Sequence, residues 1–397
     1  MIDALRPSPA GRQAELGRLR AMLRRLETSA PAARRAPAPR ALALDRVETP
    51  HGVALCRSEA VPLPASVAGA MGGAGTPDTV FLDTETTGLA GGTGTYVFLV
   101  GLARWGGGGL RVTQYFLGDL AAEAAFLAAV REALAGAGQL VTFNGRTFDL
   151  PLLETRYLLS RAPWWGADVP HLDLYPLARA LWRARVADCR LTTLETALLD
   201  LDRGDDLPGS EMPRLYFRYL RSGDPGVLPR IFAHNRWDLV ALAALAARAE
   251  ALLTGPDPRH DPREWLGAAR WLERRDSARS VRFYEAALGA DLPGAARTRA
   301  GWRLGRLWRR AGRLDAAHAL WTHVVQADPA PPLGLLVDCA KIREHHARDY
   351  RGALALTRAA LARAETEAPE ELRPAVLEAL HHRARRLERR LARRLVP

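Results

Sequence analysis

The feature that most constrains the fold is the order of strand-like and helix-like segments between residues 79 and 174. Short apolar strands are expected at residues 79–83, 96–105, 110–116, 139–144 and 171–174, and helices at residues 119–134 and 149–159. The four glycines from Gly106 to Gly109 predict a hairpin turn between the second and third strands. Because three strands precede the first helix, strand and helix do not simply alternate. The pattern therefore predicts an α/β fold with a mixed sheet, which a three-strand meander opens and helices flank.

The chain is expected to contain three further segments around this region. Residues 1–47 are predicted to form a basic leader, helical in part, and residues 48–78 a short arm or hairpin. The α/β domain is predicted to span residues 79–254, because a turn-rich stretch follows it. Residues 264–397 carry helical patterns throughout and are predicted to form an all-α domain.

Three similar helical segments recur in this last domain. The strings FYEAAL, LWTHVV and LTRAAL begin at Phe283, Leu320 and Leu356, about 37 and then 36 residues apart. Paired helices at such a period resemble tetratricopeptide repeats, which implies that this domain could recruit a protein partner. An irregular helical domain is the alternative.

Charge and composition narrow the class of protein. The formal net charge of +12 favours a polyanionic partner such as nucleic acid, although Lys341 is the only lysine and arginine is enriched throughout. No apolar run approaches the roughly 20 residues that span a bilayer, and the N-terminal residues show no secretory pattern. The three cysteines have no disulfide or zinc spacing. We therefore expect a cytoplasmic protein with no membrane contact.

An acidic pair, Asp83 and Glu85, ends the first predicted strand in the string FLDTETTGL. Side chains two residues apart on a strand point to the same face, so these carboxylates should lie together. Carboxylates held together repel unless a cation lies between them, and oxygen ligands suit hard divalent ions. The alternative is a solvated loop with unrelated acids.

Two further acidic positions follow elements of the same region. Asp149 ends the string TFNGRTFD just past a strand, where it could serve catalysis, cap the next helix, or both. His234 and Asp238 are four residues apart in a helical pattern and should share one helix face. The alternative for this pair is a helix-start histidine with a surface acid.

Together these strings resemble the motifs of the DEDD (DnaQ-like) 3′–5′ exonuclease superfamily, which has a ribonuclease H-like fold. The string DTETTGL resembles motif I, FNGRTFD motif II and HNRWD motif III. The histidine departs from the pattern, because it stands at the spacing at which tyrosine-type members carry tyrosine. Over its length the chain most resembles the YprB-like ribonuclease H-like family, whose members pair such a domain with a tetratricopeptide-like C-terminus.

The resemblance implies a two-metal hydrolysis of phosphodiester bonds. Two Mg²⁺ or Mn²⁺ ions would be held by four carboxylates, with His234 orienting the water or removing its proton. The four carboxylates are those of Asp83, Glu85, Asp149 and Asp238. The 3′ end of DNA or RNA is the implied substrate.

The same resemblance assigns residues to the substrate. It places Thr86, Thr87, Gly88 and Leu89 near the terminal nucleotide. Asn144 could bond either to substrate or to its own loop, whereas Asp173 is expected to have a structural or helix-capping role. Two other functions stay open: a structure-selective endonuclease on the same fold, and a non-catalytic nucleic-acid-binding scaffold whose repeats recruit a protein.

Overall fold

The computed structural model describes residues 43–62, 78–88, 93–106 and 109–395. Most of the predicted basic leader lies outside these residues. The chain divides into two compact units, one within Met1–Arg179 and Val186–Ala251 and the other formed by Ala180–Arg185 and Leu252–Pro397. Each unit is described separately below.

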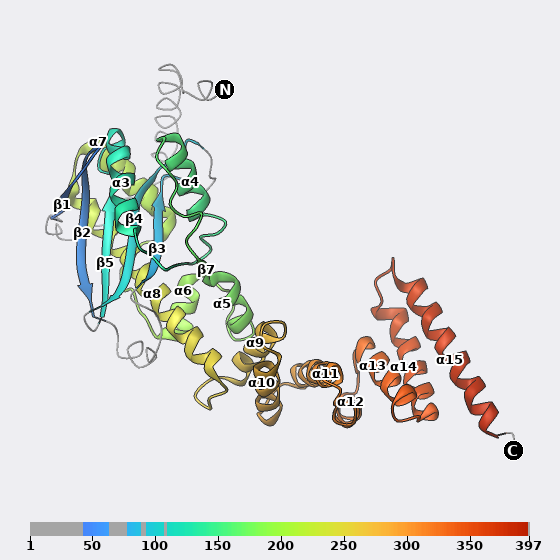
Figure 1. The fold of residues 1–397 in the computed structure, drawn as a ribbon. Coiled ribbons are helices and arrows are strands. Elements are labelled where there is room, and N and C mark those ends of the chain that lie inside the picture. The colour runs from blue at the N-terminus through green and yellow to red at the C-terminus, as the bar shows by residue number, and fades with distance from the viewer. Residues whose placement is uncertain (1–42, 63–77, 89–92, 107–108, 396–397) are drawn as a thin grey trace. The chain divides into compact units, whose positions relative to one another are not determined.

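The first unit is built on a seven-stranded mixed sheet (Figure 1). The strands lie in the order β1-β2-β5-β4-β3-β6-β7. Neighbours are antiparallel from β1 to β3, whereas β6 pairs parallel with β3 and β7 pairs parallel with β6. The strand bounds are β1 Asp45–Thr49, β2 Gly52–Val61, β3 Thr79–Thr86, β4 Val97–Gly106, β5 Gly109–Phe116, β6 Gln139–Thr142 and β7 His171–Asp173. The predicted mixed sheet and its opening meander are confirmed.

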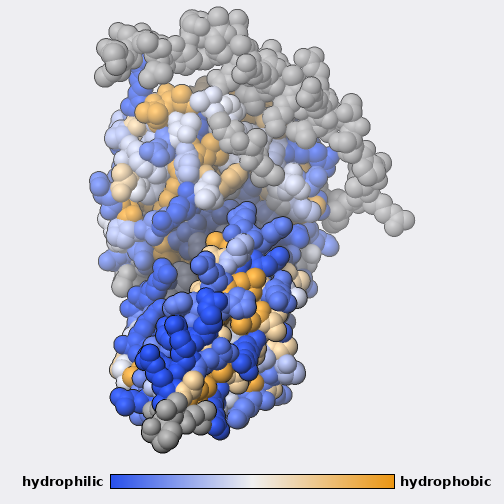
Figure 2. Space-filling model, turned by 90° about the vertical axis from the view of Figure 1, so that its right-hand side faces the viewer, coloured by the Kyte–Doolittle hydropathy of each residue, from blue (hydrophilic) through white to orange (hydrophobic). Residues whose placement is uncertain are grey.

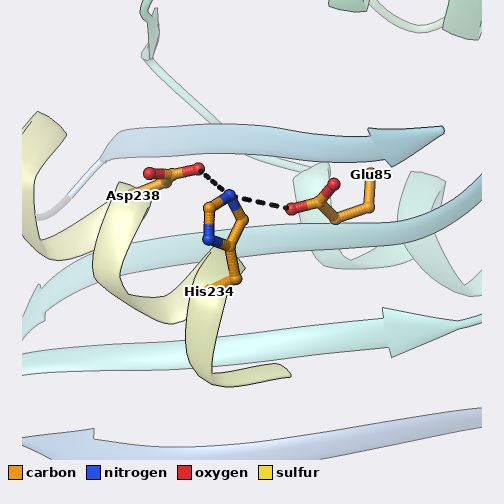
Figure 3. Close-up of side chains that lie close together, drawn as sticks. All are labelled: Glu85, His234 and Asp238. Carbon is orange, nitrogen blue, oxygen red and sulfur yellow. Dashed lines mark ion pairs between the residues drawn. The ribbon is translucent and has the colours of Figure 1, made fainter. Parts of the chain in front are cut away.

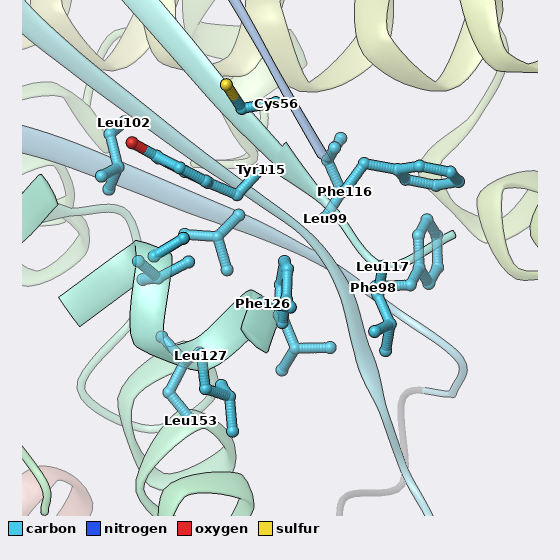
Figure 4. Packing of buried hydrophobic residues seen from close by; sticks show 14 of the residues in the cluster. Cys56, Phe98, Leu99, Leu102, Tyr115, Phe116, Leu117, Phe126, Leu127 and Leu153 are labelled. Carbon is cyan, nitrogen blue, oxygen red and sulfur yellow. The ribbon is translucent and has the colours of Figure 1, made fainter. Parts of the chain in front are cut away.

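The central strands are apolar on both faces because helices cover both sides of the sheet. In β4 the residues from Val97 to Ala103 are all buried. On one face Phe126 and Leu127 of α3 (Glu123–Leu134) pack against the strands, as Figure 4 shows. On the other face α8 (Leu228–Thr254) brings Leu239 close to the backbone of β4. The sheet is therefore the middle layer of three.

Shorter helices complete this unit. Asp119 accepts a hydrogen bond from the backbone of Ala121 and caps the short turn that leads into α3. The other elements are η2 Leu120–Ala122, α4 Asp149–Leu159, α5 Leu174–Trp182, α6 Leu191–Leu194, the π-helical turn η3 Glu195–Leu199, η4 Gly209–Glu211, α7 Met212–Ser222 and η5 Pro225–Val227. The side chain of Tyr216 in α7 stacks on Phe98 with ring centroids 4.0 Å apart. This contact fixes the segment between α6 and α8 against the sheet.

The hairpin of β1 and β2 belongs to the same sheet. Its second strand pairs with β5 over seven residues, from Leu55 opposite Phe116 to Val61 opposite Leu110. The alternating burial of β2 explains this pairing, since one side of the strand covers the core and the other faces solvent. The hairpin therefore extends the meander and belongs to the same sheet. The sequence predicts a short arm or hairpin at residues 48–78, separate from the α/β domain.

In its described residues the second unit contains helices joined by turns and no strand. Its helices are α9 Pro262–Leu272, α10 Ser277–Gly289, α11 Gly294–Arg310, α12 Leu314–Ala327, α13 Leu333–His345, α14 Tyr350–Glu367 and α15 Arg373–Leu395. The three recurring strings fall in α10, α12 and α14, the second helix of each successive pair. The predicted all-α region is confirmed, and its tetratricopeptide-like character stays a prediction.

Within this unit the basic helix α15 is tied to one buried acid. Glu344 of α13 is almost completely buried and accepts hydrogen bonds from Arg383 at 2.6 Å and from Arg386 at 2.8 and 3.0 Å. Burial alone would raise the pKa of Glu344, but these arginines outweigh it and leave the pKa below its ordinary value. Figure 2 shows the face on the side of α15, where hydrophilic residues predominate. Arg383 and Arg386 of α15 therefore have a structural role, because they bind the buried carboxylate of Glu344.

Replacing Glu344 by Gln should destabilise the helical unit by about 3 kcal/mol, because it leaves buried guanidinium groups without their counter-charge. The matched control is Glu388→Gln on α15, whose partner Arg358 is exposed and whose loss should cost less than about 1 kcal/mol. Calorimetric unfolding of the full chain measures both. Equal losses in the two variants would contradict the structural role of Glu344.

No helix in the described ranges combines the length and the apolar character that crossing a bilayer requires.

Candidate functional site

Strand β3 carries Asp83 and Glu85 at the centre of the sheet. Asp83 lies opposite Gly101 of β4, so its side chain points to the face that α8 covers. The register with β4 shifts directly after Glu85, where an irregularity ends the regular ladder. Such irregularities re-aim side chains at the ends of strands. Both carboxylates therefore face α8, as the two-residue spacing predicts.

Helix α8 brings His234 and Asp238 to Glu85. Nε2 of His234 lies 3.9 Å from Oε1 of Glu85 and 3.6 Å from Oδ2 of Asp238. Figure 3 shows the imidazole between the two carboxylates, with His234 and Asp238 one turn apart on the helix. Ligand atoms of these three residues all lie within 4.8 Å of one another. His234 is the seventh residue of α8 and the Asp238 side chain is only 16% exposed, so the alternative of a helix-start histidine with a surface acid does not hold.

Asp149 approaches β3 from α4. It is buried, and its Oδ1 accepts a hydrogen bond from the hydroxyl of Thr84, the residue between the two strand acids. The helix-capping alternative is wrong, because Phe148 occupies the cap position and Asp149 is the first helical residue. Asp149 and Asp238 thus reach β3 from two different helices.

Burial and acidic neighbours both oppose ionisation of the carboxyl groups on β3. Burial raises the pKa of Asp83 well above its ordinary value, and the charges of Asp238 and Asp149 raise it further. Burial likewise raises the pKa of Glu85, and the charge of Asp83 adds to the effect. For Asp149, burial raises the pKa to about 6 despite the hydrogen bond from Thr84. In the absence of a cation, ionising these acids is therefore costly.

This donor set fits hard divalent cations. Carboxylate oxygens are the preferred ligands of Mg²⁺ and Mn²⁺, and a bound ion would offset the burial and the mutual repulsion that raise the pKa values. Glu85, His234 and Asp238 have ligand atoms close enough to one another to hold an ion, and the charges of the predicted ligands Asp83 and Asp149 act on the carboxyl group of Glu85. Among the described residues, no cysteine belongs to this group, so it lacks the thiolate ligand that a softer metal prefers.

Sequence reasoning missed Asn235, which orients Asp83. Its amide nitrogen donates to Oδ2 of Asp83 at 2.7 Å, and its amide oxygen accepts from Gln114 at 2.8 Å. Gln114 also donates to the backbone oxygen of Phe232. The string HNRWD contains Asn235, but no spacing rule indicates that its side chain turns toward β3 rather than toward solvent.

The same contact explains a glycine in β4. A Cβ atom at Gly101 would overlap the side chains of Asn235 and Leu239. Glycine therefore lets α8 lie close enough for Asn235 to reach Asp83.

Replacing Gly101 by Ala should destabilise the α/β unit by about 2 kcal/mol, because α8 must move away from the strand. Gly106 in the same strand is the matched control, since a Cβ atom there would meet nothing within 4 Å. Chemical denaturation of Gly101→Ala and Gly106→Ala measures the difference. If Gly101→Ala were as stable as the control, the close approach of α8 would not depend on this glycine.

The predicted substrate residues lie just beyond the acidic pair. Thr87 donates its backbone N–H to the carbonyl of Tyr96 and accepts the N–H of Tyr96 on its hydroxyl, both at 2.9 Å. The hydroxyl of Thr86 donates to the carbonyl of Gly88. These bonds connect Thr87 to Tyr96, just before β4, and Thr86 to Gly88 at the end of β3. Leu89 lies outside the described residues.

Asn144 contacts its own loop. Its side-chain oxygen accepts a hydrogen bond from the Thr147 hydroxyl at 2.9 Å, and its backbone has a φ of 65°, in the left-handed region. Asp173 accepts the N–H groups of Asn144, Arg146 and Tyr175. The structural role predicted for Asp173 is confirmed, and of the two roles left open for Asn144 the structure shows the bond within the loop.

Comparison with known proteins agrees with this architecture. Residues 80–250 match the sequence pattern of the RNase_H superfamily. The chain is 29% identical over 324 residues to the uncharacterized protein YprB of Bacillus subtilis (strain 168), and the match covers 78% of this chain and 74% of YprB. A family B DNA polymerase of Pyrobaculum calidifontis is a structural match with a TM-score of 0.35 and 14% identity, covering 53% of this chain and 29% of the polymerase chain. Residues 80–250 therefore have the sequence pattern and a fold consistent with the ribonuclease H-like superfamily, in a chain that is similar to YprB over most of its length.

Proposed function

We propose that the protein is a metal-dependent 3′–5′ exonuclease that hydrolyses phosphodiester bonds of single-stranded DNA or RNA. The observation that carries this proposal is the group of Glu85, His234 and Asp238, whose ligand atoms lie within 4.8 Å of one another, with the charges of Asp83 and Asp149 acting on the same site. A domain that only binds nucleic acid has no use for buried anions facing a polyanion. With cations bound, the same group of anions becomes a site that attracts phosphate.

The residues have distinct roles in the proposed reaction. Two bound divalent ions would supply an activated water and stabilise the leaving 3′ oxygen. Asp83, Glu85, Asp149 and Asp238 would hold the ions, and Asn235 keeps Asp83 in place. The nitrogen Nε2 of His234 faces the same space, where it orients the attacking water and accepts its proton.

The polarity of the reaction is proposed from the segment that follows the acidic pair. Thr86, Thr87, Gly88 and Leu89 match the residues that meet the terminal nucleotide in DEDD exonucleases. Thr87 is fixed against Tyr96, so this segment begins at a defined position beside Glu85. A free 3′ end, rather than an internal bond, is the substrate that this arrangement suits.

A digestion experiment tests the proposal. A single-stranded oligonucleotide labelled at its 3′ end should release labelled mononucleotides in the presence of Mg²⁺ or Mn²⁺, and chelation should stop the release. An oligonucleotide with both ends blocked should stay intact. Cleavage of the blocked substrate would instead establish an endonuclease, and intact substrates under all conditions would leave a binding scaffold.

We also propose that the helical unit acts as a tetratricopeptide-like repeat array that recruits a protein partner. The support is the recurrence of similar strings in α10, α12 and α14. Stacked helix pairs form extended surfaces of the kind that such arrays use for binding.

A further inference from the structure

A cluster of charged residues that lies outside the three exonuclease-like motifs contacts His234 and Asp238. It consists of Glu195, Arg203 and Asp206, which lie between the start of η3 and the start of η4. We infer that Asp206, held by Arg203, is a positioning residue that fixes the His234 imidazole with its proton on Nδ1 and its lone pair on Nε2. The inference rests on the proposed function, in which Nε2 receives the proton of the attacking water.

Apart from His234, the hydrogen-bond partners of Asp206 in the described residues are donors. Its Oδ1 accepts the backbone N–H of Leu207 at 2.9 Å, and its Oδ2 accepts from the guanidinium of Arg203 at 3.1 Å. Oδ2 also lies 2.7 Å from Nδ1 of His234. A carboxylate paired with a guanidinium is ionised and can only accept, so Nδ1 of His234 must be the donor. In the neutral imidazole the lone pair then lies on Nε2.

Arg203 connects this histidine to the acidic site. Its guanidinium bonds both oxygens of Glu195 and one oxygen each of Asp206 and Asp238. The Arg203 side chain is 9% exposed, and that of Glu195 is 2% exposed. Because one rigid, planar group contacts all three acids, it sets the orientation of Asp206 and of Asp238 together. The proposed base and the proposed metal ligand are therefore positioned by the same side chain.

The space beside Nε2 is kept open by a glycine. A Cβ atom at Gly209 would lie 3.2 Å from Nε2 of His234, closer than an ordinary van der Waals contact. On its other sides Nε2 faces Glu85 and Asp238. The structure thus directs the lone pair of His234 into the acidic site and leaves room next to it.

The tautomer can be measured without any assay of activity. Nitrogen-15 NMR of histidine-labelled full-length protein distinguishes a protonated Nδ1 from a protonated Nε2, and a His234→Gln variant assigns the signals. In metal-free protein above neutral pH we expect the proton on Nδ1. In Asp206→Asn the amide must turn its NH₂ group toward either Leu207 or His234, both of which donate, so the wild-type tautomer should lose its preference.

Kinetics then connect the tautomer to the reaction. Asp206→Asn should lower kcat about 30-fold with little change in KM, as loss of an outer hydrogen bond does at related sites. The matched control is Asp205→Asn, since Asp205 is exposed in the same loop and should leave both the tautomer and kcat unchanged. Gly209→Ala should keep the wild-type tautomer and still lower kcat, because its methyl group crowds Nε2.

The outcomes separate this inference from the proposed function. A wild-type proton on Nε2, or an Asp206→Asn variant that matches Asp205→Asn in both tautomer and kcat, would overturn the positioning role even if the protein is an active exonuclease. Absence of nuclease activity would overturn the proposed function, and the NMR result would still decide whether Asp206 holds His234.

Discussion

Replacing Asp83 by Asn is expected to lower the rate of phosphodiester hydrolysis by at least about 1000-fold, equivalent to roughly 4 kcal/mol of transition-state stabilisation. Asp83 is held in place by Asn235, which donates to its Oδ2 at 2.7 Å. The neutral amide keeps the shape of the side chain but removes the charge that would hold a divalent ion. The rate of mononucleotide release at saturating Mn²⁺ measures the effect.

The control for this variant lies at the start of the same strand. Asp78 is exposed and directly precedes β3. Asp78→Asn makes the same chemical change away from His234 and should retain the wild-type rate. If Asp83→Asn kept more than a tenth of the wild-type rate, Asp83 would not be a ligand of the reacting metal.

Saturating Mn²⁺ is expected to raise the free energy of unfolding of the α/β unit by about 5 kcal/mol, if each of two ions is present at 100 times its dissociation constant. Like charges buried together destabilise the metal-free fold, and bound cations relieve that repulsion. Differential scanning calorimetry with and without Mn²⁺ should show the transition of this unit moving to higher temperature. The transition of the helical unit should not move.

The shifted pKa values predict how the free energy of unfolding of the metal-free protein changes with pH. Burial raises the pKa of Asp83, Glu85 and Asp149 in the folded state, that of Asp149 to about 6. The folded protein therefore binds more protons than the unfolded chain, and the free energy of unfolding falls as pH rises from the ordinary range of carboxyl groups to about 6. Metal-free protein should accordingly be more stable at pH 5 than at pH 7.

The Asp83→Asn variant also serves this second prediction. With one buried charge removed, its metal-free form should be more stable than the metal-free wild type at pH 7, and its response to Mn²⁺ should shrink. A metal-free wild type that is as stable at pH 7 as at pH 5, and unaffected by Mn²⁺, would contradict the mutual repulsion of the carboxylates.

Much of the fold could be predicted from the sequence because its patterns are local. The glycines after Trp105 indicate a hairpin, and the apolar β4 indicates a strand covered on both faces. The pairing of β2 with β5 could not be predicted in this way. It joins residues about 55 positions apart, such as Ser58 and Thr113, and no local signal specifies which strand an amphipathic hairpin joins.

The site shows the same division. The spacing of Asp83 with Glu85, and of His234 with Asp238, predicts which side chains share a face, and these residues do lie together. The supporting residues come from segments without a recognisable period. Arg203 lies in an irregular loop, and its contacts with Asp238 across 35 residues of chain depend on how that loop folds back on α8. Such contacts follow from packing rather than from sequence spacing.

The proposed hydrolysis requires cations at the carboxylates around β3 and α8. Anomalous X-ray diffraction from crystals of the full chain soaked in Mn²⁺ tests this directly. We predict two anomalous peaks about 4 Å apart, coordinated by Asp83, Glu85, Asp149 and Asp238. Crystals with no anomalous peak at these carboxylates in millimolar Mn²⁺ would contradict the proposed metal site.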